Sequence, residues 1–380
     1  MIYMNEDLLA FRDQTLRFIE EFVKPNGDSW EEQGFVPRDI LQKMGGIGFF
    51  GLRFPEEYGG LGLGPLASAV FAEALGTSTY SGFAATVLVH TDMASPHLVH
   101  AGSPSQREKY LPGVIAGELI TGIAITEPDA GSDVAGLRTS ARRDGDGWRL
   151  NGTKMFITNG VHGGLFFVAA RSNPTETGHR GISMFIVEKG TDGFSVGKTL
   201  DKHGWLSSDT AELIFDDCWV PGEALLGEEG QGFYSIMQNF QGERLVLSAL
   251  AIGESQTALD LTYGYTQTRK AFGATLFDKD AIRQRLAMLQ ARVAAARVFL
   301  YHVAWLMEQG TDVVMEISEL KALAGELVQE VTYSCQQFHG GTGYIRGTAI
   351  ERLRRDGRIA SIGGGATEVM LEEIAKRSYI

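Results

Sequence analysis

The sequence predicts an α+β fold in which a β domain lies between two helical domains. Apolar residues recur at helical spacing from Asn5 to about Gly117, short strand-like segments fill Thr121 to Val220, and helical spacing returns from Gly230 to Arg377. A doubly wound nucleotide fold would alternate strand and helix throughout, so this order argues against it. We expect an N-terminal α-helical domain over 1–120, a middle β-barrel or sandwich domain over 121–228, and a C-terminal four-helix-bundle domain over 229–380.

The helices of the first domain are predicted from apolar spacing, and their ends from proline and glycine residues. A helix is predicted through Leu8 to Val23, which Pro25 closes, and a second over Ile40 to Met44. The stretch from Pro55 to Pro65 is a glycine-rich connection, and a helix from Leu66 to Leu75 follows it.

The middle segments are short, apolar or β-branched, and separated by Gly, Asp, Asn and Pro, which is typical of strands. The sequence from Arg143 to Trp148 contains Asp-Gly pairs that favour a hairpin turn. In the last domain, apolar residues from Leu286 to Met307 recur every three or four positions and predict one long helix with a single apolar stripe. The predicted strands are Ile123–Ile125, Leu165–Arg171, Ile182–Val187, Phe194–Gly197 and Ala211–Phe215.

The bulk composition narrows the class of protein. The chain has 380 residues, 44% of them hydrophobic, which is typical of a globular protein with more than one core. A net charge of -13 without a basic stripe argues against a nucleic-acid partner. We expect no integral membrane segment, no leader peptide and, from two isolated cysteines, a reducing and cytoplasmic location. His90, His97 and His100 lack further ligands at metal spacing, so we expect no metal site.

A carboxylate and a glycine cluster form the first candidate site. Glu243 stands beside Arg244 in an apolar helical run, and Gly363-Gly364-Gly365 lets another chain segment or a ligand approach closely. A carboxylate facing such a space is a plausible general base, because burial raises its proton affinity. An ordinary surface ion pair is the alternative interpretation.

Two turns in the middle domain form the second candidate site. The stretch from Thr126 to Asp133 (TEPDAGSD) can present hydroxyl and backbone N–H groups to a polar ligand, or be an ordinary turn held by Asp and Ser. The stretch from Met155 to Gly160 (MFITNG) begins as a strand and ends in a turn. Its Phe156 could cover a planar ring, or lie on a half-buried strand.

Taken in order, these segments resemble the flavin-dependent acyl-CoA dehydrogenase family over nearly the whole chain. Each segment is weak alone, but their shared order makes a chance resemblance very improbable. The segments that carry the resemblance are Tyr58-Gly59-Gly60, ITEPDAGSD (125–133), NGTKMFITNG (151–160), SDTAELIFDD (208–217), RKAFG (269–273), HGGTGY (339–344) and GGGATEVM (363–370).

The resemblance implies FAD as the cofactor and assigns residues to it. Against the flavin ring it places Ile123, Ile125, Thr126, Phe156 and Thr158, with Thr158 near N5, the hydride acceptor. It places Ser132 at the FAD phosphate or the pantetheine arm of the substrate. Arg269 and Phe272 resemble residues that one subunit sends to a neighbour's FAD, which implies a homotetramer. The adenosine side and diphosphate are assigned to Gln337, Gly340, Gly341, Thr367 and Glu368.

The resemblance also implies where the base lies. Many members carry it in a Tyr-Glu-Gly-Thr motif, but Gly364 occupies that carboxylate position here. The long-chain and isovaleryl branches have glycine there and carry the base in a Glu-Arg-Leu motif, which Glu243-Arg244-Leu245 matches. Arg244 and Gly364 would then adjoin the substrate, with Arg244 orienting the helix rather than reacting. Asp280 and Gly363 depart from the family pattern, and Gly363 could widen the acyl pocket.

The expected activity is the dehydrogenation of a saturated acyl-CoA thioester, of medium-to-long or branched chain, to a trans-2-enoyl-CoA. Glu243 takes the α-proton, FAD takes the β-hydride, and an electron-transferring flavoprotein accepts the electrons. The alternatives are an acyl carrier protein thioester dehydrogenase of a biosynthetic pathway, an oxygen-consuming oxidase of the same fold, and a non-catalytic flavoprotein partner.

Overall fold

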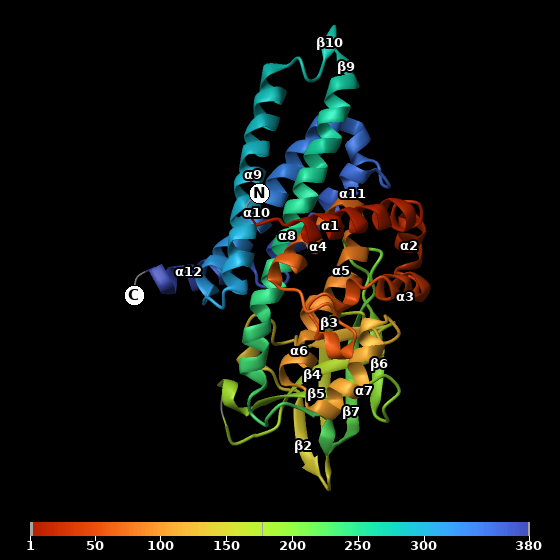
Figure 1. Cartoon of the computed structure of the whole chain (residues 1–380), viewed down its shortest axis with the longest axis vertical. Helices are drawn as coiled ribbons and strands as arrows, with labels where there is room; N and C mark the ends of the chain where they lie inside the picture. Colours follow the sequence, from red (N-terminus) through yellow and green to blue (C-terminus); the bar gives the residue numbers. More distant parts are fainter. Residues whose placement is uncertain (1–2, 177, 379–380) are drawn as a thin grey trace.

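The computed structural model describes residues 3–176 and 178–378, and helices form its first part (Figure 1). The helices predicted from apolar spacing are confirmed, and the glycine-rich connection ends where Pro65 starts α4. Pro at the first position of a helix is favoured because its missing N–H has no helical partner there. These helices are α1 (Glu6–Phe18), α2 (Gly27–Gln33), α3 (Arg38–Gly46), α4 (Pro65–Leu75), α5 (Ser81–Leu88), α6 (Pro96–Ala101) and α7 (Pro104–Ile115).

Between residues 3 and 120, two π-helical segments interrupt the helices. η1 (Ile19–Val23) continues α1, and η5 (Val89–Ala94) continues α5 up to the proline that opens α6. π-Helical turns are frequent at functional sites. The second of them lies beside the candidate site described below.

Among the residues that the structure describes, the middle part forms one eight-stranded sheet with the path β6-β7-β3-β2-β4-β5-β8, in which β1 pairs with β4. The predicted hairpin is confirmed, since Asp144 pairs with Gly147 and Gly145 has a φ of 62°. The strands are β1 (Thr121–Ala124), β2 (Ser140–Asp144), β3 (Gly147–Thr158), β4 (Leu165–Arg171), β5 (Ile182–Glu188), β6 (Phe194–Thr199), β7 (Thr210–Pro221) and β8 (Leu225–Leu226).

The sheet folds over on itself, so that its two halves enclose a core. Trp148 on β3 packs against Phe185 on β5, with ring centroids 5.2 Å apart. Successive side chains of β4 point to opposite faces: Phe166 joins this inner core, whereas Phe167 joins a second core with Leu98 of α6 and Leu111 of α7. The expected sandwich-like domain is therefore present, with helices on its outer face.

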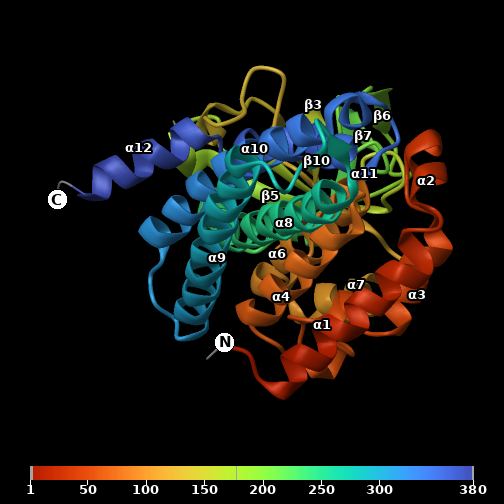
Figure 2. The same cartoon turned by 90° about the horizontal axis from the view of Figure 1, so that it is seen from above.

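Long helices form the last part, and Figure 2 shows them side by side when the molecule is seen from above. α8 packs against α4, α9 and α10, and a large apolar core fills the space between them. At 1.5 Å per residue, its 37 residues span roughly 55 Å. These elements are α8 (Gly232–Thr268), β9 (Lys270–Ala271), β10 (Ala274–Thr275), α9 (Asp280–Glu308), α10 (Val314–His339), α11 (Ala349–Asp356) and α12 (Thr367–Ser378).

α8 connects the two ends of the molecule. Its first turns lie near the β sheet, and its last residue adjoins the β9–β10 hairpin at the opposite end (Figure 1). In the part of the chain that the structure describes, no helix is long and apolar enough to cross a membrane.

Candidate active site

Glu243 lies on the buried face of α8, about three turns from its start. Its side chain is 6% exposed, and Leu245 and Val246 beside it are fully buried. Burial raises the pKa of Glu243 to about 8, because a charged carboxylate is poorly solvated there, although the Asn239 amide and the nearby Arg244 offset part of the effect. Of the two interpretations open from the sequence, a surface ion pair does not fit this burial.

The glycine cluster of the C-terminal segment packs against the same stretch of α8. A Cβ atom placed on Gly364 would lie 2.2 Å from Leu247 Cδ1, and one placed on Gly365 would lie 3.6 Å from Arg244 Nε. Residues four apart on a helix share a face, so Leu247 lies one turn beyond Glu243 on the face that meets the cluster. The structure thus brings the two halves of the first candidate site together.

Only glycine fits this arrangement of the backbone. Gly364 and Gly365 have φ values of 61° and 105°, a region that residues with a Cβ atom rarely adopt. Lys321 of α10, which is 2% exposed, anchors the glycine segment through its backbone. Its Nζ donates to the carbonyl oxygens of Ala360, at 2.6 Å, and of Gly365, at 3.0 Å.

The same segment offers unused backbone donors. Within the described residues, the N–H groups of Gly364, Gly365 and Ala366 have no hydrogen-bond partner, whereas those of Ile362 and Gly363 donate to Ile359. Gly364 is exposed. Unpaired N–H groups beside a buried carboxyl group can bind a carbonyl oxygen on which negative charge develops.

The second candidate site forms where β3 is irregular. The pairing of β3 with β7 shifts between Lys154 and Ile157, so the strand bulges there and Phe156 takes a φ of 61°. A bulge redirects a side chain, and Phe156 is 65% exposed although it is large and apolar. An exposed aromatic ring on such a turn is suited to cover a planar ligand.

A buried ion pair holds the neighbouring loop to β3. Lys154 Nζ, which is fully buried, donates to Glu127 Oε1 at 2.8 Å and to the carbonyl oxygen of Ile125 at 2.9 Å. Glu127 also accepts from the backbone N–H groups of Arg138 and Thr139. The two turns are therefore held together, and Met155 N also donates to Thr126 O at 2.8 Å.

Hydroxyl groups on these turns are free to bind a ligand. No described residue forms a hydrogen bond with the side chains of Thr126, Ser132 or Thr158, all of which lie on the two joined turns. Ile123 is half-buried, and Ile125 is buried in the core that α8 shares with the sheet. An apolar floor with an exposed aromatic ring and unpaired hydroxyls fits a flavin ring, which needs stacking and a few directed hydrogen bonds.

The remaining predicted cofactor residues lie elsewhere. Arg269 ends α8, and Phe272 in the β9–β10 hairpin is 97% exposed, at the end of the molecule opposite the sheet (Figure 1). Gln337, Gly340 and Gly341 end α10 near that hairpin, where the neighbouring His339 stacks on Tyr265. Thr367 and Glu368 begin α12, next to the glycine cluster. One chain therefore does not gather all of them around one ligand.

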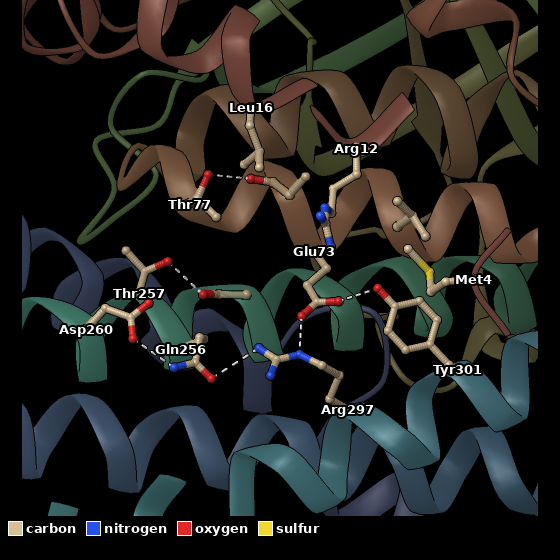
Figure 3. A pocket seen from close by; sticks show the side chains of 13 residues that line it. Met4, Arg12, Leu16, Glu73, Thr77, Gln256, Thr257, Asp260, Arg297 and Tyr301 are labelled. Carbon is tan, nitrogen blue, oxygen red and sulfur yellow. Dashed lines mark hydrogen bonds and ion pairs between the residues drawn. The ribbon is translucent and has the colours of Figure 1, made fainter. Parts of the chain in front are cut away.

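A pocket of about 450 Å³ lies away from these residues, between α1, α4, α8 and α9 (Figure 3). Glu73 accepts hydrogen bonds there from Arg297 and Tyr301, so its charge is already paired. Its lining includes Gln256 of α8, more than three turns beyond Glu243. This polar network ties α4 to α9 and is separate from both candidate sites.

Three contributors to the site were missed by reading the sequence. The Lys154–Glu127 pair and Lys321 have partners distant in the sequence, so no local pattern indicated them. Asn239 donates to Glu243 Oε1 at 3.1 Å, and the spacing of four residues on a helix could have indicated this contact. In the described ranges, no group of three His, Cys, Asp or Glu side chains is placed to hold a metal ion.

Comparison with known proteins assigns the chain to a family. Family models for the N-terminal, middle and C-terminal domains of acyl-CoA dehydrogenases match residues 5–118, 122–218 and 230–379. The chain is 39% identical to the mitochondrial long-chain specific acyl-CoA dehydrogenase of Mus musculus, covering 97% of this chain and 85% of that protein. It is 35% identical to the mitochondrial isovaleryl-CoA dehydrogenase of Arabidopsis thaliana, covering 97% and 90%.

Solved structures agree with this assignment. The acyl-CoA dehydrogenase of Geobacillus kaustophilus superposes with a TM-score of 0.95 at 38% identity, covering 100% of this chain and 99% of that one. An FAD complex of PigA superposes with a TM-score of 0.95 at 28% identity, covering 99% and 98%. The chain belongs to the acyl-CoA dehydrogenase family and is an FAD-dependent enzyme.

Proposed function

We propose that the protein dehydrogenates a saturated acyl-CoA thioester to the trans-2-enoyl-CoA, and that Glu243 is the base that takes the α-proton. The observation that carries the proposal is the burial of Glu243 on α8, where its helix neighbours Arg244 and Leu247 contact the glycine segment and Gly364 is exposed. When bound, FAD supplies the acceptor, at N5, for the hydride that leaves the β-carbon.

Glu243 is suited to this role by its proton affinity. A base works best when its pKa lies near the operating pH, and burial raises the pKa of Glu243 to about 8. An ordinary surface carboxylate would be a weaker base toward the weakly acidic α-carbon. The apolar neighbours Leu245 and Val246 exclude water from the helix around the carboxyl group.

The glycine segment is proposed to bind the thioester carbonyl. Loss of the α-proton moves negative charge onto that oxygen, and N–H groups already in place stabilise it without reorganisation. The unpaired N–H groups of Gly364, Gly365 and Ala366 are the proposed donors, on the segment that packs against α8 at Arg244 and Leu247. Ser132 and Arg244 are proposed to contact the rest of the substrate, with Arg244 filling the space between α8 and α12.

We assign the flavin ring to the joined turns of the β domain. Phe156 would cover the ring, and Thr126 and Thr158 would donate hydrogen bonds to it, above Ile123 and Ile125. Thr367 and Glu368 would pass close to the diphosphate. Because Arg269 and Phe272 lie at the opposite end of α8, we propose that they reach the FAD of a second subunit, together with Gln337, Gly340 and Gly341 on the adenosine side.

These assignments require an oligomer, and we propose a homotetramer.

The relatives named for long-chain and isovaleryl substrates support a medium-to-long or branched acyl chain. We further propose an electron-transferring flavoprotein as the electron acceptor. A solved structure described as the electron transferring flavoprotein of Acidaminococcus fermentans superposes on this chain with a TM-score of 0.95 at 34% identity. The cytoplasmic location expected from the sequence stays a prediction.

The test is anaerobic bleaching of the bound flavin by a panel of straight-chain and branched acyl-CoAs. The proposal predicts rapid loss of the yellow colour with at least one of them, and unchanged absorbance with every thioester would contradict it.

A carrier-protein substrate is the second candidate, because the prolyl acyl carrier protein oxidase AnaB superposes with a TM-score of 0.93 at 30% identity. Bleaching by acyl carrier protein thioesters alone, or peroxide formation in air, would favour that candidate.

A further inference from the structure

A single amide group joins Glu243 to an interrupted helix of the N-terminal domain. Asn239 is 6% exposed, and its Nδ2 lies 2.8 Å from the carbonyl oxygen of Met93 and 3.1 Å from Glu243 Oε1. The carbonyl oxygen of Asp92 lies 3.5 Å away from the same atom. One buried donor group thus serves two different elements.

The interruption explains why a side chain is needed there. η5 is π-helical, with Ser95 N donating to the carbonyl oxygen of His90, and Pro96 then opens α6. Proline has no N–H to give to the preceding turn, so the carbonyl groups of that turn are short of donors. A buried carbonyl group without a donor is destabilising, and Asn239 supplies one.

The surroundings also fix which way the amide points. Both neighbours of Nδ2 are oxygen atoms, a carbonyl and a carboxyl group, and both accept hydrogen bonds. The NH2 end has two hydrogens, one for each, whereas the reversed amide would place its oxygen against two acceptors. The carbonyl of Met93 therefore orients the amide, and the amide orients Glu243.

We propose that Asn239 is a positioning residue: anchored on the carbonyl groups before Pro96, it holds the carboxyl group of Glu243 in the orientation in which it accepts the α-proton. This inference rests on the proposed role of Glu243. It assigns the interrupted helix of the N-terminal domain a part in the reaction, although that helix carries none of the residues expected to act.

The loss of the Asn239 hydrogen bond can be distinguished from the influence of the charged groups around Glu243. Arg244 on its own helix lowers the pKa of Glu243, and so does the Asn239 hydrogen bond. On the N-terminal side, Arg53 lies beside α8 and forms an ion pair with Asp92 at 3.7 Å. On α12, Glu373 raises and Arg377 lowers the pKa of Arg244. Arg244 in turn lowers the pKa of Lys321 on α10. A neutral change at 239 leaves all of these charges in place.

The test compares Asn239→Ala and the nearly isosteric, neutral Asn239→Leu with Gln238→Ala, an exposed neighbour on the same helix. Each holoenzyme is titrated with an acyl-CoA that bleaches the wild-type flavin, and the rate constant of anaerobic flavin reduction is measured across pH. We expect an unchanged flavin content and roughly tenfold slower reduction in both Asn239 variants, since misplacing a reacting group slows chemistry strongly. The apparent pKa of the rate should rise by roughly one unit, because a donor to the ionised form is lost.

The outcomes separate this inference from the proposed function. If Glu243→Gln abolishes flavin reduction while both Asn239 variants keep the wild-type rate and pH profile, the positioning role is wrong and the base stands. If Glu243→Gln reduces its flavin normally, the base assignment itself fails. A variant that loses flavin without a shift in the apparent pKa would show a purely structural role for Asn239, and would also overturn the inference.

Discussion

Leu247 occupies the space that a side chain at position 364 would need: a Cβ atom on Gly364 would lie 2.2 Å from Leu247 Cδ1. This contact sets the distance between α8 and the C-terminal glycine segment. Leu247 lies one helical turn beyond Glu243 on α8, and the backbone of Gly364 that it contacts is exposed. The Glu243 carboxyl group on α8 can therefore act where Gly364, in the C-terminal segment, has no side chain.

Gly364→Ala should destabilise the protein and slow flavin reduction. The φ of 61° is strained for alanine, at about 1–2 kcal/mol, and the clash with Leu247 adds about 1–3 kcal/mol. Gly34→Ala is the control, because Gly34 has a φ of 84° and open space around it, so only strain applies. Denaturant unfolding should show that Leu247→Ala restores stability in the Gly364→Ala background. Additive effects of the two substitutions would mean that the contact is unimportant.

Lys321→Met should lower turnover more than stability. Removing the ammonium group frees the carbonyl groups of Ala360 and Gly365, so the glycine segment loses its anchor. Removal of a buried charge offsets part of the lost hydrogen bonding, because burial also lowers the pKa of Lys321 to about 8. We expect roughly tenfold slower flavin reduction. Ser318→Ala, one turn earlier on α10 with a hydroxyl bonded to Val314, is the matched control, and an equal rate in both variants would refute the anchoring role.

Glu254→Gln should flatten the dependence of stability on pH. Burial raises the pKa of Glu254 to about 8, with a smaller contribution from Asp356. The folded state therefore keeps a proton that the unfolded state loses near 4.5, and stability falls as pH rises from about 4.5 to 8. Near pH 8 the variant should be more stable than the wild type by roughly 2–4 kcal/mol. Unfolding curves at several pH values test this, with the exposed Glu372→Gln as control; parallel curves for wild type and Glu254→Gln would contradict it.

Elements with a local cause could be predicted from the sequence. The hairpin through Gly145 follows from Asp-Gly chemistry, and the helices from Leu66 and Leu286 follow from apolar spacing. β7 is longer than expected, since it continues from Phe215 to Pro221 through Asp216 and Asp217, which usually mark turns. Pairing with β3 outweighs that local preference.

Contacts across the fold could not be predicted in the same way. The positive φ of Phe156 depends on a bulge in the register of β3 with β7, a strand more than fifty residues later. Lys321 donates only to backbone carbonyl groups, which have no sequence signature. The pairing of Glu243 with the glycine cluster was predictable only through the resemblance to a family, because periodicity does not show which distant segments meet.

The most direct test of Glu243 as the catalytic base is anaerobic flavin reduction in Glu243→Gln and in Glu254→Gln. Both residues are buried glutamates on α8 whose pKa is raised to about 8, and three helical turns separate them on nearly the same face. We predict that Glu243→Gln binds FAD and acyl-CoA but reduces its flavin roughly 10²–10⁴-fold more slowly, while Glu254→Gln keeps the wild-type rate. A wild-type rate in Glu243→Gln would show that the proton acceptor lies elsewhere.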